Sequence, residues 1–90
     1  MTEDVVQALR ERIAERDRAI LAAVNARLEL VARLKEIKKA QGIEFVDPEQ
    51  EERLLAALER ANGGPLSKHG LRRLFEEILA LTKAELEQEQ

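Results

Sequence analysis

The sequence predicts an all-α chain of three helices, one long, one short and one of medium length. No Gly or Pro occurs from Thr2 to Gln41, whereas Gly42 and the run Gly63-Gly64-Pro65 interrupt the chain further on. Charged residues make up 37% of the chain and aromatic residues only 2%, a balance typical of long helices. With four Gly and two Pro, there is little material for the tight turns of a β fold. We expect residues 1–90 to form one domain.

The first predicted helix, about residues 2–41, is defined by apolar residues that recur at steps of three and four. The pattern runs through Val6, Leu9, Ile13, Ile20, Val24, Val31, Leu34 and Ile37. At about 1.5 Å per residue, such a helix is about 60 Å long. A helix of this length needs a partner along most of its surface to be stable.

The second and third helices follow clear start signals. Residues 48–62 begin at Asp47-Pro48, where Asp47 serves as N-cap and Gln50 as its capping-box partner. The third helix, about residues 68–87, begins after Ser67. We expect the inward-facing residues to be Leu54, Leu55 and Leu58 of the second helix and Leu71, Leu74, Phe75, Ile78, Leu81 and Leu86 of the third.

The bulk numbers argue against several classes of function. A net charge of −3 does not favour nucleic-acid binding. No apolar run approaches the roughly 20 residues of a membrane span. Since no basic start precedes an apolar core, we expect no secretory signal and a cytoplasmic location. The absence of Cys removes disulfides, thiolate metal sites and Cys nucleophiles.

Three cations share the apolar stripe of the first helix. On a wheel of about 100° per residue, Arg10, Arg27 and Lys38 fall in one wedge about 120° wide. The apolar residues of this wedge are Val6, Ile13, Ile20, Val24, Val31 and Leu34. Lys35 lies near the edge of the wedge. Burying an unpaired charge costs on the order of several kcal/mol of folding free energy, so these cations need an explanation. They could extend to solvent, pair with carboxylates or set the helix register. A bound dicarboxylate would satisfy all three together.

Spacing along the helix indicates how such a site would be built. Arg10 and Arg27 are about 25 Å apart along the axis, and Arg27 and Lys38 about 16 Å. No small metabolite spans the distance from Arg10 to Arg27 on one helix. If two copies pair antiparallel about a point near Leu21, Arg10 of one copy lies beside the stretch from Arg27 to Lys38 of the other. Twofold symmetry then gives two identical sites, each built from both chains.

Several motifs carry a family resemblance over essentially the whole chain. They are Leu9-Arg10-Glu11-Arg12-Ile13 with Asp17, Asn25-Ala26-Arg27, Lys35-Glu36-Ile37-Lys38, Asp47-Pro48 followed by Glu51, and Leu74-Phe75. In their combined spacing the sequence resembles the AroQ-type chorismate mutases. The resemblance implies three-helix chains intertwined into an antiparallel homodimer. It also implies an isomerase of the shikimate pathway of aromatic amino acid biosynthesis, which rearranges chorismate to prephenate without a metal or cofactor.

The resemblance further implies a role for each catalytic residue. Arg10 of the partner and Arg27 would hold the two carboxylates of chorismate. Lys38 would contact the ether oxygen and a carboxylate. Asp47 and Glu51 would lie near the substrate hydroxyl.

Three other positions are implied as substrate contacts, and two of them depart from the family pattern. Thr82 falls where a small hydroxyl or Gly contacts a carboxylate. Gln50 stands where many members carry another arginine, although its polar side chain could still lie near the ligand. Leu86 stands where a Gln or Glu approaches the ether oxygen, and Leu cannot donate that hydrogen bond. Either Lys83, Glu85 or Gln88 takes the role, or Lys38 acts alone and turnover is reduced.

Three other readings remain open from the sequence. An isochorismate-pyruvate lyase shares the fold and a similar cation set. A regulatory chorismate-mutase-like module would associate with a DAHP synthase, the aldolase that opens the shikimate pathway. A structural antiparallel coiled-coil dimer would bind no anion, and in that case Arg27→Leu would stabilise the protein.

Overall fold

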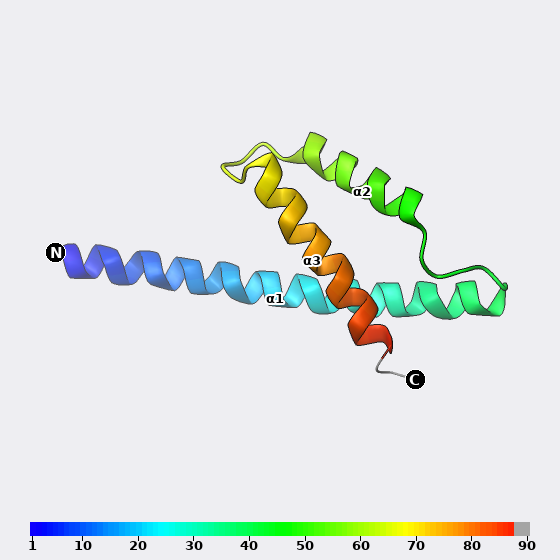
Figure 1. The fold of residues 1–90 in the computed structure, drawn as a ribbon. Helices are drawn as coiled ribbons and strands as arrows, with labels where there is room; N and C mark the ends of the chain where they lie inside the picture. Colours follow the sequence, from blue (N-terminus) through cyan, green and yellow to red (C-terminus); the bar gives the residue numbers. More distant parts are fainter. Residues whose placement is uncertain (88–90) are drawn as a thin grey trace. The chain divides into compact units, whose positions relative to one another are not determined.

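The computed structural model describes residues 1–87. They form three helices, α1 (Thr2–Ala40), α2 (Pro48–Ala61) and α3 (Lys68–Glu87), as Figure 1 shows. The expected bounds of 2–41, 48–62 and 68–87 differ from these by at most one residue. Since the described residues contain no strand, the three-helix, all-α class is confirmed. None of these helices is long and apolar enough to cross a membrane.

The chain divides into two units, Met1–Ala32 and Arg33–Gln90, with the boundary inside α1. The first unit is a single stretch of helix, opened by Glu3 and Asp4, whose charges suit the positive end of the helix dipole. No residue of α1 is buried. Seven large apolar residues of this unit are between 40% and 62% exposed: Val5, Val6, Leu9, Ile13, Ile20, Leu21 and Leu30. One copy of the chain therefore leaves the apolar stripe of α1 uncovered.

The end of α1 lies in the second unit and is closed by a glycine with a left-handed backbone. Gly42 has φ 69°. Its N–H donates to the carbonyl of Lys39 (3.2 Å), and the N–H of Ile43 donates to that of Lys38 (2.8 Å). These two bonds form a Schellman motif. A Cβ at Gly42 would meet nothing within 4 Å, so the backbone conformation, and not space, favours glycine here.

The start of α2 is fixed by its N-cap. The Asp47 carboxylate accepts the N–H of Gln50 at 3.2 Å, and Pro48 is the first helical residue. The expected capping box is only half formed. The side-chain oxygen of Gln50 accepts two bonds from the guanidinium of Arg53, at 3.2 and 3.0 Å, instead of the N–H of Asp47. The Gln50 side-chain oxygen therefore binds Arg53, one turn further along α2, and not the main chain at Asp47.

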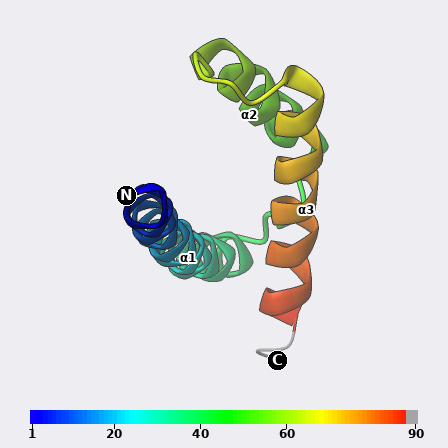
Figure 2. The same cartoon turned by 90° about the vertical axis from the view of Figure 1, so that its left-hand side faces the viewer.

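The helices α2 and α3 form an antiparallel hairpin, whose turn is visible in Figures 1 and 2. Asn62 organises the turn, since its side chain accepts the N–H of Gly64 (3.1 Å) and donates to the carbonyl of Leu66 (2.8 Å). Ser67 then caps α3, because its hydroxyl accepts the N–H of Gly70 at 2.9 Å. The chain is thereby returned along α2 within a few residues.

The core of the second unit is small. Its buried residues are Leu55, Leu71, Thr82 and Leu86. The expectation that Leu74 and Leu81 face this core is wrong for the single chain, because both are exposed. On the wheel of α3 they lie about 80° from the line through Leu71 and Thr82. A two-helix contact covers one stripe of α3, and this second stripe falls outside it.

Candidate active site

The predicted site residues are divided between the two units. Arg10 and Arg27 lie on α1 in the first unit, and the others lie in the second: Lys38, Asp47, Gln50, Glu51, Thr82 and Leu86. Within the second unit they come from the end of α1, the first turn of α2 and the last turns of α3.

Lys38 is half-buried in the last turn of α1. Its ammonium donates to the carbonyl oxygen of Phe45 at 3.3 Å. The Schellman turn brings this carbonyl back over the end of α1. Since a carbonyl is neutral, the hydrogen bond orients the Lys38 ammonium without cancelling its charge. A cation held in this way is suited to bind an anionic group.

The acidic residues of the site lie in and beside the first turn of α2. The Asp47 carboxylate is the N-cap, so it accepts a main-chain bond and is fixed in place. One turn on, Glu51 forms an ion pair with Lys83 of α3, at 3.1 Å between Oε2 and Nζ, and both side chains are half-buried. Gln50 lies between them in sequence but is exposed and engaged by Arg53.

The third-helix side of the site is less polar than expected. Thr82 is only 5% exposed, and its hydroxyl donates to the carbonyl of Ile78, one turn back in α3, at 2.7 Å. Leu86 is 3% exposed, so its side chain belongs to the core. Of the residues considered as substitutes for it, Lys83 is engaged with Glu51, Glu85 is exposed, and Gln88 lies outside the described residues.

Two residues near the site were not assigned a site role from the sequence. The ammonium of Lys35 donates to the carbonyl of Leu86 at 3.1 Å and lies 5.7 Å from the centre of the Phe45 ring. The sequence contains one signal for Lys35, its position near the edge of the wedge that contains Arg10, Arg27 and Lys38. No pattern in the sequence pairs Phe45 with a lysine.

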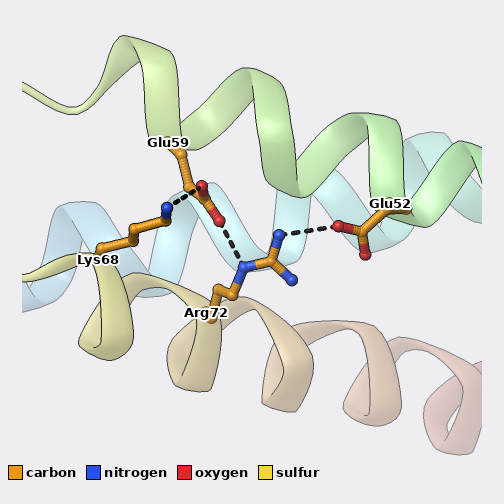
Figure 3. Close-up of polar contacts among 4 residues, drawn as sticks. All are labelled: Glu52, Glu59, Lys68 and Arg72. Carbon is orange, nitrogen blue, oxygen red and sulfur yellow. Dashed lines mark hydrogen bonds and ion pairs between the residues drawn. The ribbon is translucent and has the colours of Figure 1, made fainter.

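A charged network fixes the hairpin that carries Glu51 (Figure 3). The guanidinium of Arg72 on α3 donates to Glu52 at 2.8 Å and also to Glu59, both on α2. Lys68 lies 3.6 Å from the second oxygen of Glu59. The hydrogen bond from Arg72 lowers the pKa of Glu59, and the bonds to Glu52 and Glu59 raise the pKa of Arg72. The network therefore holds α2 and α3 in one register at neutral pH.

Comparisons with known proteins agree with these features. A family model described as chorismate mutase type II matches residues 9–87. The form II structure of chorismate mutase from Thermus thermophilus is 33% identical, with a TM-score of 0.86 over 91% of this chain and 93% of that chain. The form I structure of that protein is 34% identical, with a TM-score of 0.83 over 86% and 96%. No curated protein matched the sequence.

The family match covers the stretch of α1 that carries Arg10, Arg27 and Lys38, all of α2, and α3 to its last described residue. The identity and the coverage both extend over most of the chain. This chain belongs to the chorismate mutase type II family, and it is an isomerase that converts chorismate to prephenate.

Proposed function

We propose that the chain rearranges chorismate in a site shared by two copies, with Arg27 and Lys38 from one copy and Arg10 from the other. The observation that supports this most directly is the continuity of α1, a single helix from Thr2 to Ala40. Arg10 and Arg27 are therefore held about 25 Å apart within one copy. A compact dicarboxylate can meet both only if Arg10 is supplied by a second chain.

The uncovered stripe of α1 supports the same arrangement. Its large apolar residues in the first unit are roughly half exposed in a single copy. Full burial of one Leu or Ile side chain stabilises by about 1.5–3 kcal/mol. A second α1 laid antiparallel offers a matching stripe, since a twofold interface is self-complementary. This pairing would cover the apolar residues and bring Arg10 to the second site in one step.

The reaction requires positioning and charge, and these residues are suited to provide both. Within one molecule of chorismate the ether C–O bond breaks as a C–C bond forms, so no group leaves and no proton must be moved. Paired arginines can each grip a carboxylate bidentately and hold the enolpyruvyl arm over the ring. Lys38 would stabilise the negative charge that develops on the ether oxygen. Asp47 and Glu51 would lie near the ring hydroxyl, whose single proton one of them can accept, and Thr82 would contact a carboxylate.

Mixing inactive variants tests the shared site. Arg10→Ala and Arg27→Ala homodimers should each be folded and form no prephenate. When the two are mixed and allowed to exchange subunits, each heterodimer contains one intact site. Random exchange should then restore about a quarter of the wild-type activity.

The matched control mixes Arg27→Ala with Lys38→Met. Both of these residues are assigned to the same side of the site, so every heterodimer has two defective sites and should recover nothing. Absence of recovery from the Arg10→Ala and Arg27→Ala mixture, with heterodimers verified by native mass spectrometry, would exclude the shared site. Pyruvate release from isochorismate, measured beside prephenate formation, reports any lyase activity of the same preparations.

Two wider expectations stay predictions. The cytoplasmic location is one, and association with a DAHP synthase is the other. Co-purification of the full chain with that aldolase, and a change in prephenate formation on adding it, would support the association.

A further inference from the structure

Two lysines of α1 meet at the same aromatic residue. The Lys35 ammonium lies 5.7 Å from the centre of the Phe45 ring, and the Lys38 ammonium is 3.3 Å from the Phe45 carbonyl oxygen. The two lysines are three positions apart along the helix, so they lie on neighbouring turns of one face. Both are half-buried. Two positively charged side chains therefore contact Phe45 near the end of α1.

Lys35 also reaches the far side of the site. Its ammonium donates to the carbonyl oxygen of Leu86 at 3.1 Å, across 51 residues of sequence. The side chain of Leu86 is buried and offers no polar group. The side-chain donor that lies at this end of α3 therefore comes from Lys35 on α1, and not from position 86 of α3.

Neither ammonium group contacts a carboxylate within residues 1–87. Their partners are two main-chain carbonyls and an aromatic ring, all of them neutral. Among residues 1–87, the ion pairs involve Arg53, Lys68, Arg72 and Lys83, and neither Lys35 nor Lys38. Two half-buried like charges on one helix face repel each other, and the repulsion is relieved when an anion binds between them.

We propose that Lys35 is a second substrate-contacting cation that acts with Lys38 on the ether oxygen of chorismate. The inference rests on the proposed function, in which Lys38 contacts that oxygen. An ammonium has three donors, and one hydrogen bond to a carbonyl leaves the others for a ligand. The contacts with Phe45 and Leu86 fix Lys35 before the substrate arrives. The attraction between the Lys35 charge and the substrate is strongest in the transition state, when negative charge develops on the ether oxygen. Lys35 therefore acts mainly on kcat.

Steady-state kinetics on the full-length protein test this role. Lys35→Met should lower kcat on the order of 100-fold, the loss typical of removing one preorganised donor, with a smaller effect on KM. Lys35→Gln keeps an amide that can donate to the Leu86 carbonyl but removes the charge, and it should lose as much. Lys35→Arg keeps the charge and should recover part of kcat. The matched control is Lys39→Met, which removes an exposed charge from the same turn and should leave kcat unchanged.

The outcomes separate this inference from the function on which it rests. If Lys35→Gln has the wild-type kcat while Lys38→Met is inactive, the second cation is not needed and the inference is wrong. If Lys38→Met also has the wild-type kcat, the proposed site itself is wrong. A lower melting temperature for Lys35→Met together with a wild-type kcat would show that Lys35 only anchors α3, which also overturns the inference.

Discussion

The ion pair between Glu51 and Lys83 joins the proposed hydroxyl-binding side of the site to α3. The two atoms are 3.1 Å apart and both side chains are half-buried. Pairs of this kind contribute modestly to stability, about 0–1 kcal/mol when exposed. Their effect on geometry is larger, because Lys83 restricts the directions in which the Glu51 carboxylate can point. We therefore regard Lys83 as a positioning residue for Glu51.

Replacing Lys83 should separate these two effects. Lys83→Met should change the free energy of unfolding by no more than about 1 kcal/mol. It should raise KM for chorismate about fivefold to tenfold, because Glu51 is no longer aimed at the hydroxyl. Urea unfolding and steady-state kinetics measure the two quantities. Lys83→Arg should restore KM. A wild-type KM for Lys83→Met would mean that Glu51 does not depend on this pair.

The residues of the proposed site differ in how far the sequence could predict them. Arg10, Arg27 and Lys38 were predicted because a cation on an apolar stripe is anomalous within one helix. The partner of Glu51 could not be predicted, since its 32-residue separation depends on the register of the α2–α3 hairpin. The approach of Lys35 to Leu86, across 51 residues, depends on tertiary packing in the same way.

Among the helices, α2 and α3 are joined by a small apolar core and by a charged network. Only Leu55, Leu71, Thr82 and Leu86 are buried in the described residues. The Arg72 network runs along the same contact, from Glu59 near the turn to Glu52 near the start of α2 (Figure 3). The hairpin that the Arg72 network stabilises also carries Glu51 and Lys83. Loss of the network should therefore make the positions of these two side chains less well defined.

The hairpin should lose stability in acid. Arg72 lowers the pKa of Glu59 below its ordinary value of 4.5. The unfolded chain therefore binds a proton at higher pH than the folded chain does. The stabilisation from Glu59 is complete above about pH 4.5 and is lost as the pH falls through the lowered pKa.

Glu59→Gln measures this contribution. The variant should have a lower urea midpoint than the wild type at pH 7, and the difference should shrink as the pH is lowered below 4.5. The control is Glu77→Gln, an exposed residue of α3, which should show no such convergence. A difference between Glu59→Gln and the wild type that is the same at pH 7 and in acid would contradict the assigned role of this carboxylate.

The bounds of the helices were predictable because local signals define them. The Gly42 stop, the Asp47-Pro48 start and the Ser67 cap all act within a few residues, and all are present in the structure. Which residues of α3 face the core was less predictable. Leu74 and Leu81 fit the same periodicity as the buried leucines, and only the number of neighbouring elements decides which stripe is covered.

On the scale of the whole molecule, the single chain leaves many large apolar side chains on α1 and α3 exposed. The stripe on α1 and the pair Leu74 and Leu81 on α3 are each open in one copy. Large contiguous apolar patches of this kind indicate association. We propose that a second copy of the chain covers these apolar residues, because the same association also brings Arg10 of that copy to the proposed site.

Association should make stability depend on concentration. The melting temperature of the wild type should rise with protein concentration, because dimer formation shifts unfolding by mass action. Ile20→Lys places a charge in the middle of the α1 stripe and should give a monomer of reduced helicity without activity. Analytical ultracentrifugation and circular dichroism report the two effects. An active monomeric Ile20→Lys variant would rule out the dimer as the working form.

The turn at Gly42 has a consequence for the order of folding. The Lys38 ammonium and the Phe45 carbonyl are seven residues apart, whereas the Glu51 and Lys83 contact closes a loop of 32 residues and the Lys35 and Leu86 contact one of 51. Short loops close at lower entropic cost and sooner than long ones. We therefore expect the contact between Lys38 and Phe45 to form before the two contacts with α3, so that α3 would dock against an α1 end that is already ordered.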